Sequence, residues 1–416
     1  MGDGGLEPTS KATVVAVRAL VAADRLSLRQ YEGPAPVPDE HADVHWGRRP
    51  VATPLARYRG HEVRTIAGSD WPGYFVVEVE ASTGHVGLGV SVGGPAGCWV
   101  VEQHLSHFVL GRSPFEFEVI WDQMFRGSLF YGRKGLVLHA ISAVDLALWD
   151  LMGRITGHPV YELLGGPSRD RLEFYATTPN PEAAKDGGFM GCKLPLWFGV
   201  SAGRDGLKRN VDRFAHAREI VGPDLMLAYD CWMGLDVETA AELGHRLLPY
   251  EPAWLEECLP PDDYWGYGRL RRRLPERIAV SGGEHEATRW GFRSLSSIGR
   301  VDLLQPDPSW CGGMTELAKI VAEAETAGRR VVPHTCGPYS LHAGFAWASV
   351  PFSECILASP RGDRQVPQFG PLFTGEPLVQ NGSLSIEELA RPGFGLDLNP
   401  EVQLVRPTVA RLAGAP

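Results

Sequence analysis

Seven acidic and basic side chains recur along the second half of the chain at intervals that suit a single catalytic centre. They are Lys193, Asp230, Glu256, Glu284, Asp307, His334 and Glu354. Their spacing runs from 20 residues, between 334 and 354, to 37 residues, between 193 and 230, which fits one β–α unit per step. Because side chains at the carboxyl ends of parallel barrel strands converge on one mouth, we expect these residues to meet there.

Three of these residues, Asp230, Glu256 and Glu284, are carboxylates on what would be neighbouring strands. In a semi-enclosed site three such charges repel one another, and a hard divalent cation with oxygen ligands relieves the repulsion. Mg²⁺ is favoured because it accepts a few carboxylates and leaves positions for substrate and water. The alternative for each acid taken alone is a solvated strand end or a helix cap, an explanation that three acids in phase weaken.

Asp307 and His334 close the next two expected strands and predict an acid–base pair. A hydrogen bond to the aspartate would hold the imidazole in one tautomer and raise its basicity. The alternative is a core histidine paired with a backbone carbonyl. His285 follows an expected metal ligand and would either orient that ligand or cap the next helix. The tryptophans at 254 and 310 are expected to pack inside the barrel rather than to stack on a sugar.

The elements that must position these residues begin after Gly165-Gly166-Pro167, where short apolar runs alternate with helical patterns. This alternation is typical of repeated β–α units with a parallel sheet. The expected strands are residues 172–176, 191–194, 225–229, 254–256, 278–281, 301–305, 331–333 and 354–357, with helices at 237–248 and 314–327 among the connections. Eight strands predict an α/β fold with a closed (β/α) TIM-type barrel.

The residues before Gly165 have a different pattern. Residues 13–22 and 74–81 are half-alternating, as strands are, and residues 137–152 have apolar side chains at helical spacing. The Gly-Gly-Pro sequence then stops the chain and predicts a domain boundary. Between the two strands, residues 32–64 are rich in Pro, His and Arg and predict a long functional loop.

Composition excludes several classes of protein. The chain has 416 residues and a net charge of −10, and its 40 Lys and Arg are scattered, so nucleic acid is not an expected partner. Its seven cysteines are odd in number and form no Cys-x-x-Cys pair, which predicts reduced thiols rather than disulfides or a zinc knuckle. The acidic start is unlike a signal peptide, and no apolar run of membrane-spanning length is expected. We therefore expect a soluble, cytoplasmic protein that binds no membrane.

Several longer runs of the sequence are distinctive when taken together. They are Asp-Cys-Trp-Met from 230, Trp-Leu-Glu-Glu-Cys-Leu-Pro-Pro from 254, Gly-Glu-His from 283, Gln-Pro-Asp from 305, Trp-Cys-Gly-Gly from 310, Pro-Phe-Ser-Glu from 351, Val-Asp-Leu-Ala-Leu-Trp-Asp-Leu from 144 and Pro-Gly-Phe-Gly from 392. In these runs the chain resembles the mandelate-racemase-like branch of the enolase superfamily. The resemblance covers nearly the whole chain. It implies an α+β capping domain with a substrate-specificity loop at 1–165, the barrel with the catalytic site at 166–370, and a segment at 371–416 that returns to the capping domain.

The resemblance also implies roles for single residues. Mg²⁺ would lie on Asp230, Glu256 and Glu284, beside a His334–Asp307 dyad. Glu354 would hydrogen-bond to the enolate and stabilise it. Lys193 is expected to be a further catalytic residue. The expected substrate contacts are His41, Arg64, His285 and Glu354, with His45 as a rival of His41.

The activity that the resemblance implies is Mg²⁺-dependent dehydration of a sugar acid, L-rhamnonate or a close stereochemical relative, to the 2-keto-3-deoxy acid. Racemases of that branch resemble one another in a Lys-x-Lys base on the second strand, whereas this chain has Lys193-Leu194-Pro195. One histidine working on one face therefore fits elimination best. Racemisation, epimerisation, cycloisomerisation and a catalytically silent sugar-acid-binding barrel are the alternatives. The resemblance further implies a homo-oligomer, with an octamer as one candidate.

Overall fold

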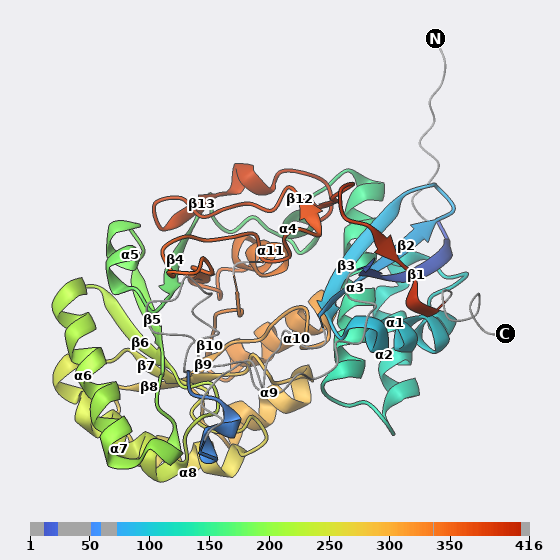
Figure 1. Cartoon of the computed structure of the whole chain (residues 1–416). Helices are drawn as coiled ribbons and strands as arrows, with labels where there is room; N and C mark the ends of the chain where they lie inside the picture. The colour runs from blue at the N-terminus through green and yellow to red at the C-terminus, as the bar shows by residue number, and fades with distance from the viewer. Residues whose placement is uncertain (1–11, 24–50, 60–72, 336, 409–416) are drawn as a thin grey trace.

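The computed structural model describes residues 12–23, 51–59, 73–335 and 337–408. These residues form a small sheet covered by helices, which lies beside a larger barrel of strands and surrounding helices (Figure 1). The expected fold class, a barrel with an α+β cap, is confirmed.

The first unit, here called the capping unit, is built on a four-stranded sheet. Its strands are β1 (Val14–Ala22), β2 (Tyr74–Ala81), β3 (Val86–Val92) and β15 (Leu404–Val405), in the order β15-β1-β2-β3. β1, β2 and β3 pair antiparallel, and β15 brings the end of the chain back to β1. The helices α1 (Gly94–Gln103), α2 (Phe117–Ser128) and α3 (Leu136–Thr156) complete the unit, with short turns η5 (Leu105–Phe108) and η6 (Pro114–Glu116) between them.

The sequence did not predict β3, and the reason is its glycines. Gly87 and Gly89 face α3 so closely that an added Cβ would lie 2.1 Å from the Ala147 carbonyl oxygen and 2.0 Å from that of Ala143. Glycine weakens a strand pattern but marks a close approach of backbones. Here the close approach lets α3 pack directly on the sheet.

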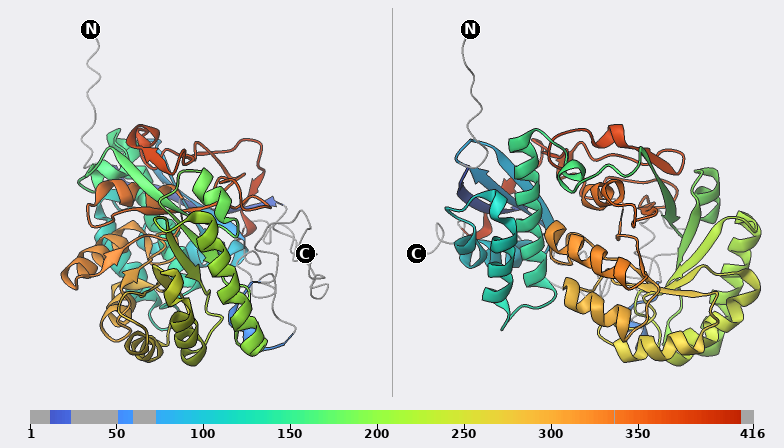
Figure 2. Two further views of the ribbon diagram at one scale, coloured as in Figure 1. Left: turned by 90° about the vertical axis from the view of Figure 1, so that its left-hand side faces the viewer. Right: turned by 180° about the vertical axis from the view of Figure 1, so that it is seen from behind.

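Helix α3 lies between the sheet of the capping unit and the barrel helix α10 (Gly313–Thr326), as the view from behind shows (Figure 2). By length and composition it could cross a membrane, so the expectation that no apolar run reaches that length is wrong. However, 89% of its apolar window is buried inside the protein, as in the core helix of a globular domain.

The barrel strands follow one another around the sheet in sequence order. They are β4 (Arg171–Thr177), β5 (Gly191–Pro195), β6 (Met226–Asp230), β7 (Trp254–Glu256), β8 (Ala279–Gly282), β9 (Leu303–Leu304), β10 (Arg330–Val331) and β11 (Ser353–Ile356). All are parallel, and β11 pairs with β4, which gives the ring order of a barrel. Within the described ranges no ladder joins β10 to β11. All eight expected strands are confirmed, with ends that differ by up to two residues.

Helices cover the outside of the barrel (Figure 1). They are α5 (Pro181–Asp186), α6 (Gly203–Val221), α7 (Val237–Leu247), α8 (Tyr264–Arg273), α9 (Thr288–Ser297), α10 and α11 (Pro338–Ala346). Local sequence sets their starts: the Asp236 side chain, for example, accepts a hydrogen bond from the Thr239 N–H at 2.8 Å and begins α7. The expected helices at 237–248 and 314–327 are confirmed.

The remaining elements are short. They are η4 (Pro54–Arg57), α4 (Val160–Leu163), η7 (Val200–Ala202), η8 (Leu248–Tyr250), β12 (Phe373–Thr374), β13 (Ser383–Ser385), η9 (Ile386–Leu389) and β14 (Asp397–Leu398). β13 pairs antiparallel with β4, and η4 lies against the barrel, where the Ala52 N–H donates to the Leu196 carbonyl oxygen at 2.8 Å. Of the long loop expected at 32–64, only residues 51–59 are described.

His342 on α11 is buried where the barrel meets α4 and the C-terminal segment. Its Nδ1 lies 3.0 Å from the Tyr161 backbone nitrogen and accepts that hydrogen bond, and its ring packs edge-on against Phe394 at 5.2 Å. Burial lowers the pKa of His342 to about 3, so the ring is neutral in the folded protein.

This depressed pKa predicts a pH dependence of stability. Between the folded pKa near 3 and the ordinary value near 6.5, the unfolded chain binds a proton that the folded chain does not, so stability falls as pH drops through 6.5. At pH 5 this group lowers the free energy of unfolding by about 2 kcal/mol relative to its high-pH limit. Urea unfolding at pH 5 and 7 should show a smaller pH effect for His342→Asn, which keeps an acceptor for Tyr161. An equal pH effect in both proteins would contradict this.

Candidate active site

The three expected metal ligands lie at the carboxyl ends of adjacent strands. Asp230 and Glu256 are the last residues of β6 and β7 and are partners in register, and Glu284 follows the end of β8 by two residues. All three side chains are buried. The Asp230 Oδ1 accepts the Trp232 N–H at 3.0 Å, and Glu284 Oε1 accepts the Trp232 indole N–H at 3.2 Å. The strand order therefore places these carboxylates side by side at one end of the barrel.

Lys193 and Glu354 lie deeper than the sequence predicted. Lys193 is the middle residue of β5 and Glu354 is the second residue of β11, so neither closes its strand. Of the seven residues, only Asp230 and Glu256 close their strands, because Glu284, Asp307 and His334 follow the ends of theirs. The expectation that all seven close strands is therefore wrong for five of them. The Lys193 and Glu354 side chains are about 1% exposed, and Lys193 Nζ lies 2.9 Å from Glu354 Oε1. They form a buried ion pair beneath the strand ends because β5 and β11 both flank β4.

Glu256 connects this ion pair to the strand ends. Its Oε1 is in contact with Lys193 Nζ, and its Oε2 accepts hydrogen bonds from Gln305 Nε2 at 2.6 Å and Trp254 Nε1 at 3.1 Å. Burial raises the pKa of Glu256 to about 8 although Lys193 opposes the shift, and the charges of Asp230, Glu354 and Glu284 add to it. The barrel end thus holds more negative charge than its own lysine balances.

His334 and Asp307 follow β10 and β9 and are hydrogen-bonded. His334 Nδ1 lies 2.8 Å from Asp307 Oδ2, while the opposite ring nitrogen, Nε2, lies 3.6 Å from Glu284 Oε2. Burial alone would lower the pKa of His334, but the Glu284 carboxylate and the hydrogen bond to Asp307 raise it to about 10. Without a cation on the carboxylates the ring is therefore an imidazolium that faces the acidic side chains through Nε2, and a metal ion held by those carboxylates would lower this pKa and free Nε2 to act as a base.

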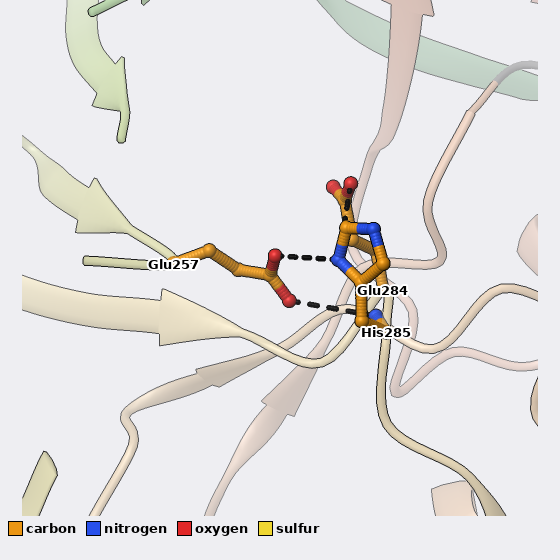
Figure 3. Close-up of side chains that lie close together, drawn as sticks. All are labelled: Glu257, Glu284 and His285. Atoms are coloured by element: carbon orange, nitrogen blue, oxygen red, sulfur yellow. Dashed lines mark hydrogen bonds and ion pairs between the residues drawn. The ribbon is translucent and has the colours of Figure 1, made fainter. Parts of the chain in front are cut away.

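Glu257 is a site residue that sequence reasoning missed. It has a φ of 40°, so the chain turns through the left-handed region directly after β7, and its carboxylate points at His285 (Figure 3). His285 Nδ1 lies 2.7 Å from Glu257 Oε2 and 3.6 Å from Glu284 Oε1. The signal for Glu257 was the double acid in the Trp-Leu-Glu-Glu run, but strict strand alternation points the second acid away from the site.

His285 does not cap the next helix, because α9 has Ala287 at its N-cap position. Burial would lower the pKa of His285, but Glu257 raises it to about 9, with a smaller contribution from Glu284. The imidazole is therefore held as a cation against the Glu257 carboxylate, with Glu284 Oε1 3.6 Å from the same nitrogen. His41, Arg64 and the rival His45 lie outside the described residues.

Two sets of donors could hold a metal ion here, and both include Glu284. Oxygen and nitrogen donors of Glu257, Glu284 and His285 lie within 4.8 Å of one another. In that set, however, the His285 nitrogen is already paired with Glu257, and a protonated imidazole is not a ligand. Asp230, Glu256 and Glu284 supply carboxylate oxygens alone, the donors that Mg²⁺ prefers, although among the described residues their donor atoms are not gathered within 4.8 Å as those of the first set are. The chemistry of this second set therefore fits Mg²⁺.

One tryptophan lies beside both histidines of the site, and another packs inside the barrel. Trp310 is half-buried, and its ring centroid lies 5.3 Å from that of His334 and 5.6 Å from that of His285. Trp254 is 3% exposed and packs inside the barrel as expected. The expectation of interior packing is not met by Trp310, which is half-buried and contacts both histidine rings.

Two family models match the chain. The model of the mandelate racemase and muconate lactonizing enzyme N-terminal domain matches residues 64–165, and the enolase C-terminal domain-like model matches residues 181–402. The chain is 51% identical over 369 residues to an L-rhamnonate dehydratase from Saccharopolyspora erythraea, covering 88% of this chain and 94% of that protein.

Solved structures agree with these matches. A rhamnonate dehydratase from Gibberella zeae complexed with Mg superimposes with a TM-score of 0.89 at 39% identity, over 97% of this chain and 98% of the other. The 3,6-anhydro-D-galactonate cycloisomerase from Zobellia galactanivorans superimposes with a TM-score of 0.68 at 30% identity, over 78% and 92% of the two chains. With its barrel, its cap and these matches along most of its length, the chain belongs to the mandelate racemase and muconate lactonizing enzyme branch of the enolase superfamily.

Proposed function

We propose that this protein is a Mg²⁺-dependent hydro-lyase that dehydrates L-rhamnonate, or a sugar acid of closely related stereochemistry, to the 2-keto-3-deoxy acid. The observation that carries the proposal is the His334 imidazole, held by Asp307 at Nδ1 and facing the carboxylate cluster through Nε2. The 51% identity to an L-rhamnonate dehydratase supports the choice of substrate.

The proposed reaction begins with proton removal at C2 of the sugar acid. Asp230, Glu256 and Glu284 would hold Mg²⁺, which when bound stabilises the negative charge that develops on the substrate carboxylate. His334 takes the C2 proton at Nε2 while Asp307 keeps Nδ1 protonated. The same imidazolium then delivers a proton to the departing C3 hydroxyl, and the enol product tautomerises to the keto acid. Use of a His or Lys base with Mg²⁺ in this superfamily is an established pattern.

For Glu354 we propose stabilisation of the enolate, with Lys193 as its partner. A carboxyl group donates a hydrogen bond only when protonated, and here Lys193 and His334 lower the pKa of Glu354 to about 2 although burial opposes this. The Lys193 ammonium, 2.9 Å away, favours the charged carboxylate, so a hydrogen bond from Glu354 to the enolate requires Glu354 to gain a proton when the substrate binds.

We propose that His41, Arg64 and His285 contact the substrate. For His285 the support is its place beside Glu284. For His41 and Arg64 the support is that the described residues between them, 51–59, lie against the barrel loop after β5, where Val51, Ala52 and Ala56 are buried.

We propose further that residues 1–165, 166–370 and 371–416 form the cap, the barrel and the returning segment, in line with the pairing of β15 to β1. The protein is proposed to be cytoplasmic and homo-oligomeric, an octamer being one candidate, and to bind neither membrane nor nucleic acid. Size-exclusion chromatography with light scattering measures the subunit number.

A panel of sugar acids tests the proposed function. We expect Mg²⁺-dependent appearance of a 2-keto-3-deoxy acid from L-rhamnonate, with L-mannonate and L-lyxonate as the next candidates, and no product in the presence of EDTA. Exchange or inversion at C2 without loss of water would favour a racemase. A panel without any turnover, by a protein that binds Mg²⁺ in calorimetry, would favour a sugar-acid-binding barrel.

A further inference from the structure

A run of three hydrogen bonds, the first two of them buried, connects the capping unit to the proposed base. Ser91 on β3 donates from its hydroxyl to the Ser309 carbonyl oxygen at 2.6 Å. The Ser309 N–H donates to Asp307 Oδ1 at 2.6 Å, and Asp307 Oδ2 lies 2.8 Å from His334 Nδ1. Asp307 thus contacts the His334 imidazole through Oδ2, while its Oδ1 is held by the Ser309 N–H.

The residues of this run are shielded from water. Ser91 is fully buried, Asp307 is 4% exposed and Ser309 is 7% exposed. Asp307 and Ser309 lie on one turn. The Trp310 and Cys311 N–H groups close this turn by donating to the Asp307 carbonyl oxygen at 2.9 and 2.8 Å. Buried polar groups need partners, so the Ser91 hydroxyl is the donor that satisfies the Ser309 carbonyl from across the domain boundary.

We propose that Ser91 is a positioning residue for catalysis, through which the capping unit sets the orientation of the His334–Asp307 dyad. This inference rests on the proposed function. The carbonyl and N–H of Ser309 belong to different peptide groups, so Ser91 acts by fixing the backbone of Ser309 in space rather than by relaying charge. The fixed N–H then holds the Asp307 carboxylate in the plane that His334 requires.

Replacing Ser91 with alanine is expected to lower kcat by about 10-fold, as the loss of an outer partner of a site residue does. KM should change little, because the base acts on substrate that is already bound. Ser142→Ala is the matched control: Ser142 on α3 is also fully buried, accepts the Gly312 N–H at 2.9 Å across the same boundary and has no contact with Asp307 in the described hydrogen bonds. Ser142→Ala should keep kcat within about 2-fold of the wild type.

A second readout does not depend on turnover. In protein labelled with ¹⁵N-histidine, the Nδ1–H proton of His334 gives a downfield NMR resonance that His334→Asn identifies by its loss. We expect Ser91→Ala to shift or broaden this resonance and Ser142→Ala to leave it in place. If Ser91→Ala does not fold, Ser91→Cys keeps the size of the side chain with a weaker donor.

An unchanged His334 resonance in Ser91→Ala, or equal losses of kcat in Ser91→Ala and Ser142→Ala, would overturn the positioning role. If the wild-type protein dehydrates no sugar acid, the proposed function fails by itself. The NMR comparison still decides whether Ser91 orients the dyad.

Discussion

Replacing His334 with asparagine is expected to lower kcat for sugar-acid dehydration by about 10³-fold or more. One imidazole is proposed to carry out both proton transfers, and each transfer by a positioned group contributes about 10²- to 10⁴-fold. Asparagine retains a polar group near Asp307 but cannot accept a proton. Steady-state kinetics with saturating Mg²⁺ and L-rhamnonate measure the effect.

His342→Asn is the matched control, because His342 is a buried histidine on α11 that takes part in packing and not in the site. It should retain kcat within about 2-fold, and His334→Asn should still bind Mg²⁺ because no expected ligand is removed. Substantial turnover by His334→Asn would mean that another group removes the C2 proton. His285 would then be the next candidate, since its Nδ1 also lies 3.6 Å from the Glu284 carboxylate.

Replacing Glu256 with glutamine is expected to weaken Mg²⁺ binding by more than about 100-fold, beyond the roughly 10- to 100-fold that outer partners of metal ligands cost. Activity at moderate Mg²⁺ should fall with it. The change removes one of three carboxylates from the proposed ligand set and also breaks the contact with Lys193. Isothermal titration calorimetry with Mg²⁺ measures the affinity.

The neighbouring acid provides a sharp comparison. Glu257→Gln removes the partner of His285 and should weaken Mg²⁺ binding by only about 10-fold, through the orientation of Glu284. If instead Glu257→Gln abolished binding while Glu256→Gln retained it, the metal would lie on Glu257, Glu284 and His285, the compact donor group at this end of the barrel.

Much of the fold could be predicted because it repeats. Each barrel strand is a short apolar run in the sequence, and a helical pattern follows most of these runs. Eight such units in succession predict a barrel of parallel strands. β3 escaped prediction because Gly87 and Gly89 replace the side chains that mark a strand, and their purpose, close contact with α3, involves residues about 60 positions later. β9 and β10 are only two residues long, so their ends were the least predictable.

The candidate site could be predicted as far as strand phase determines it. Asp230 and Glu256 close β6 and β7 and Glu284 lies two residues beyond β8, so reading the residues at or just after each strand end finds all three. The depth of Lys193 and Glu354 could not be predicted in this way. It depends on which layer of side chains inside the barrel each of the two residues belongs to. Glu257 reaches the site because its backbone has a positive φ directly after β7. The alternation of side chains along a strand does not predict such a turn. The contact of Ser91 with Ser309 spans 218 positions of the chain and becomes visible only when the cap is seated on the barrel.

We propose that side chains from separate barrel strands hold one divalent ion beside the imidazole of His334. Anomalous diffraction from a crystal loaded with Mn²⁺ in place of Mg²⁺ locates that ion. We expect a single strong peak bonded to oxygens of Asp230, Glu256 and Glu284, on the side that His334 Nε2 faces. A peak bonded to Glu257 and His285, or no peak at this end of the barrel, would contradict it.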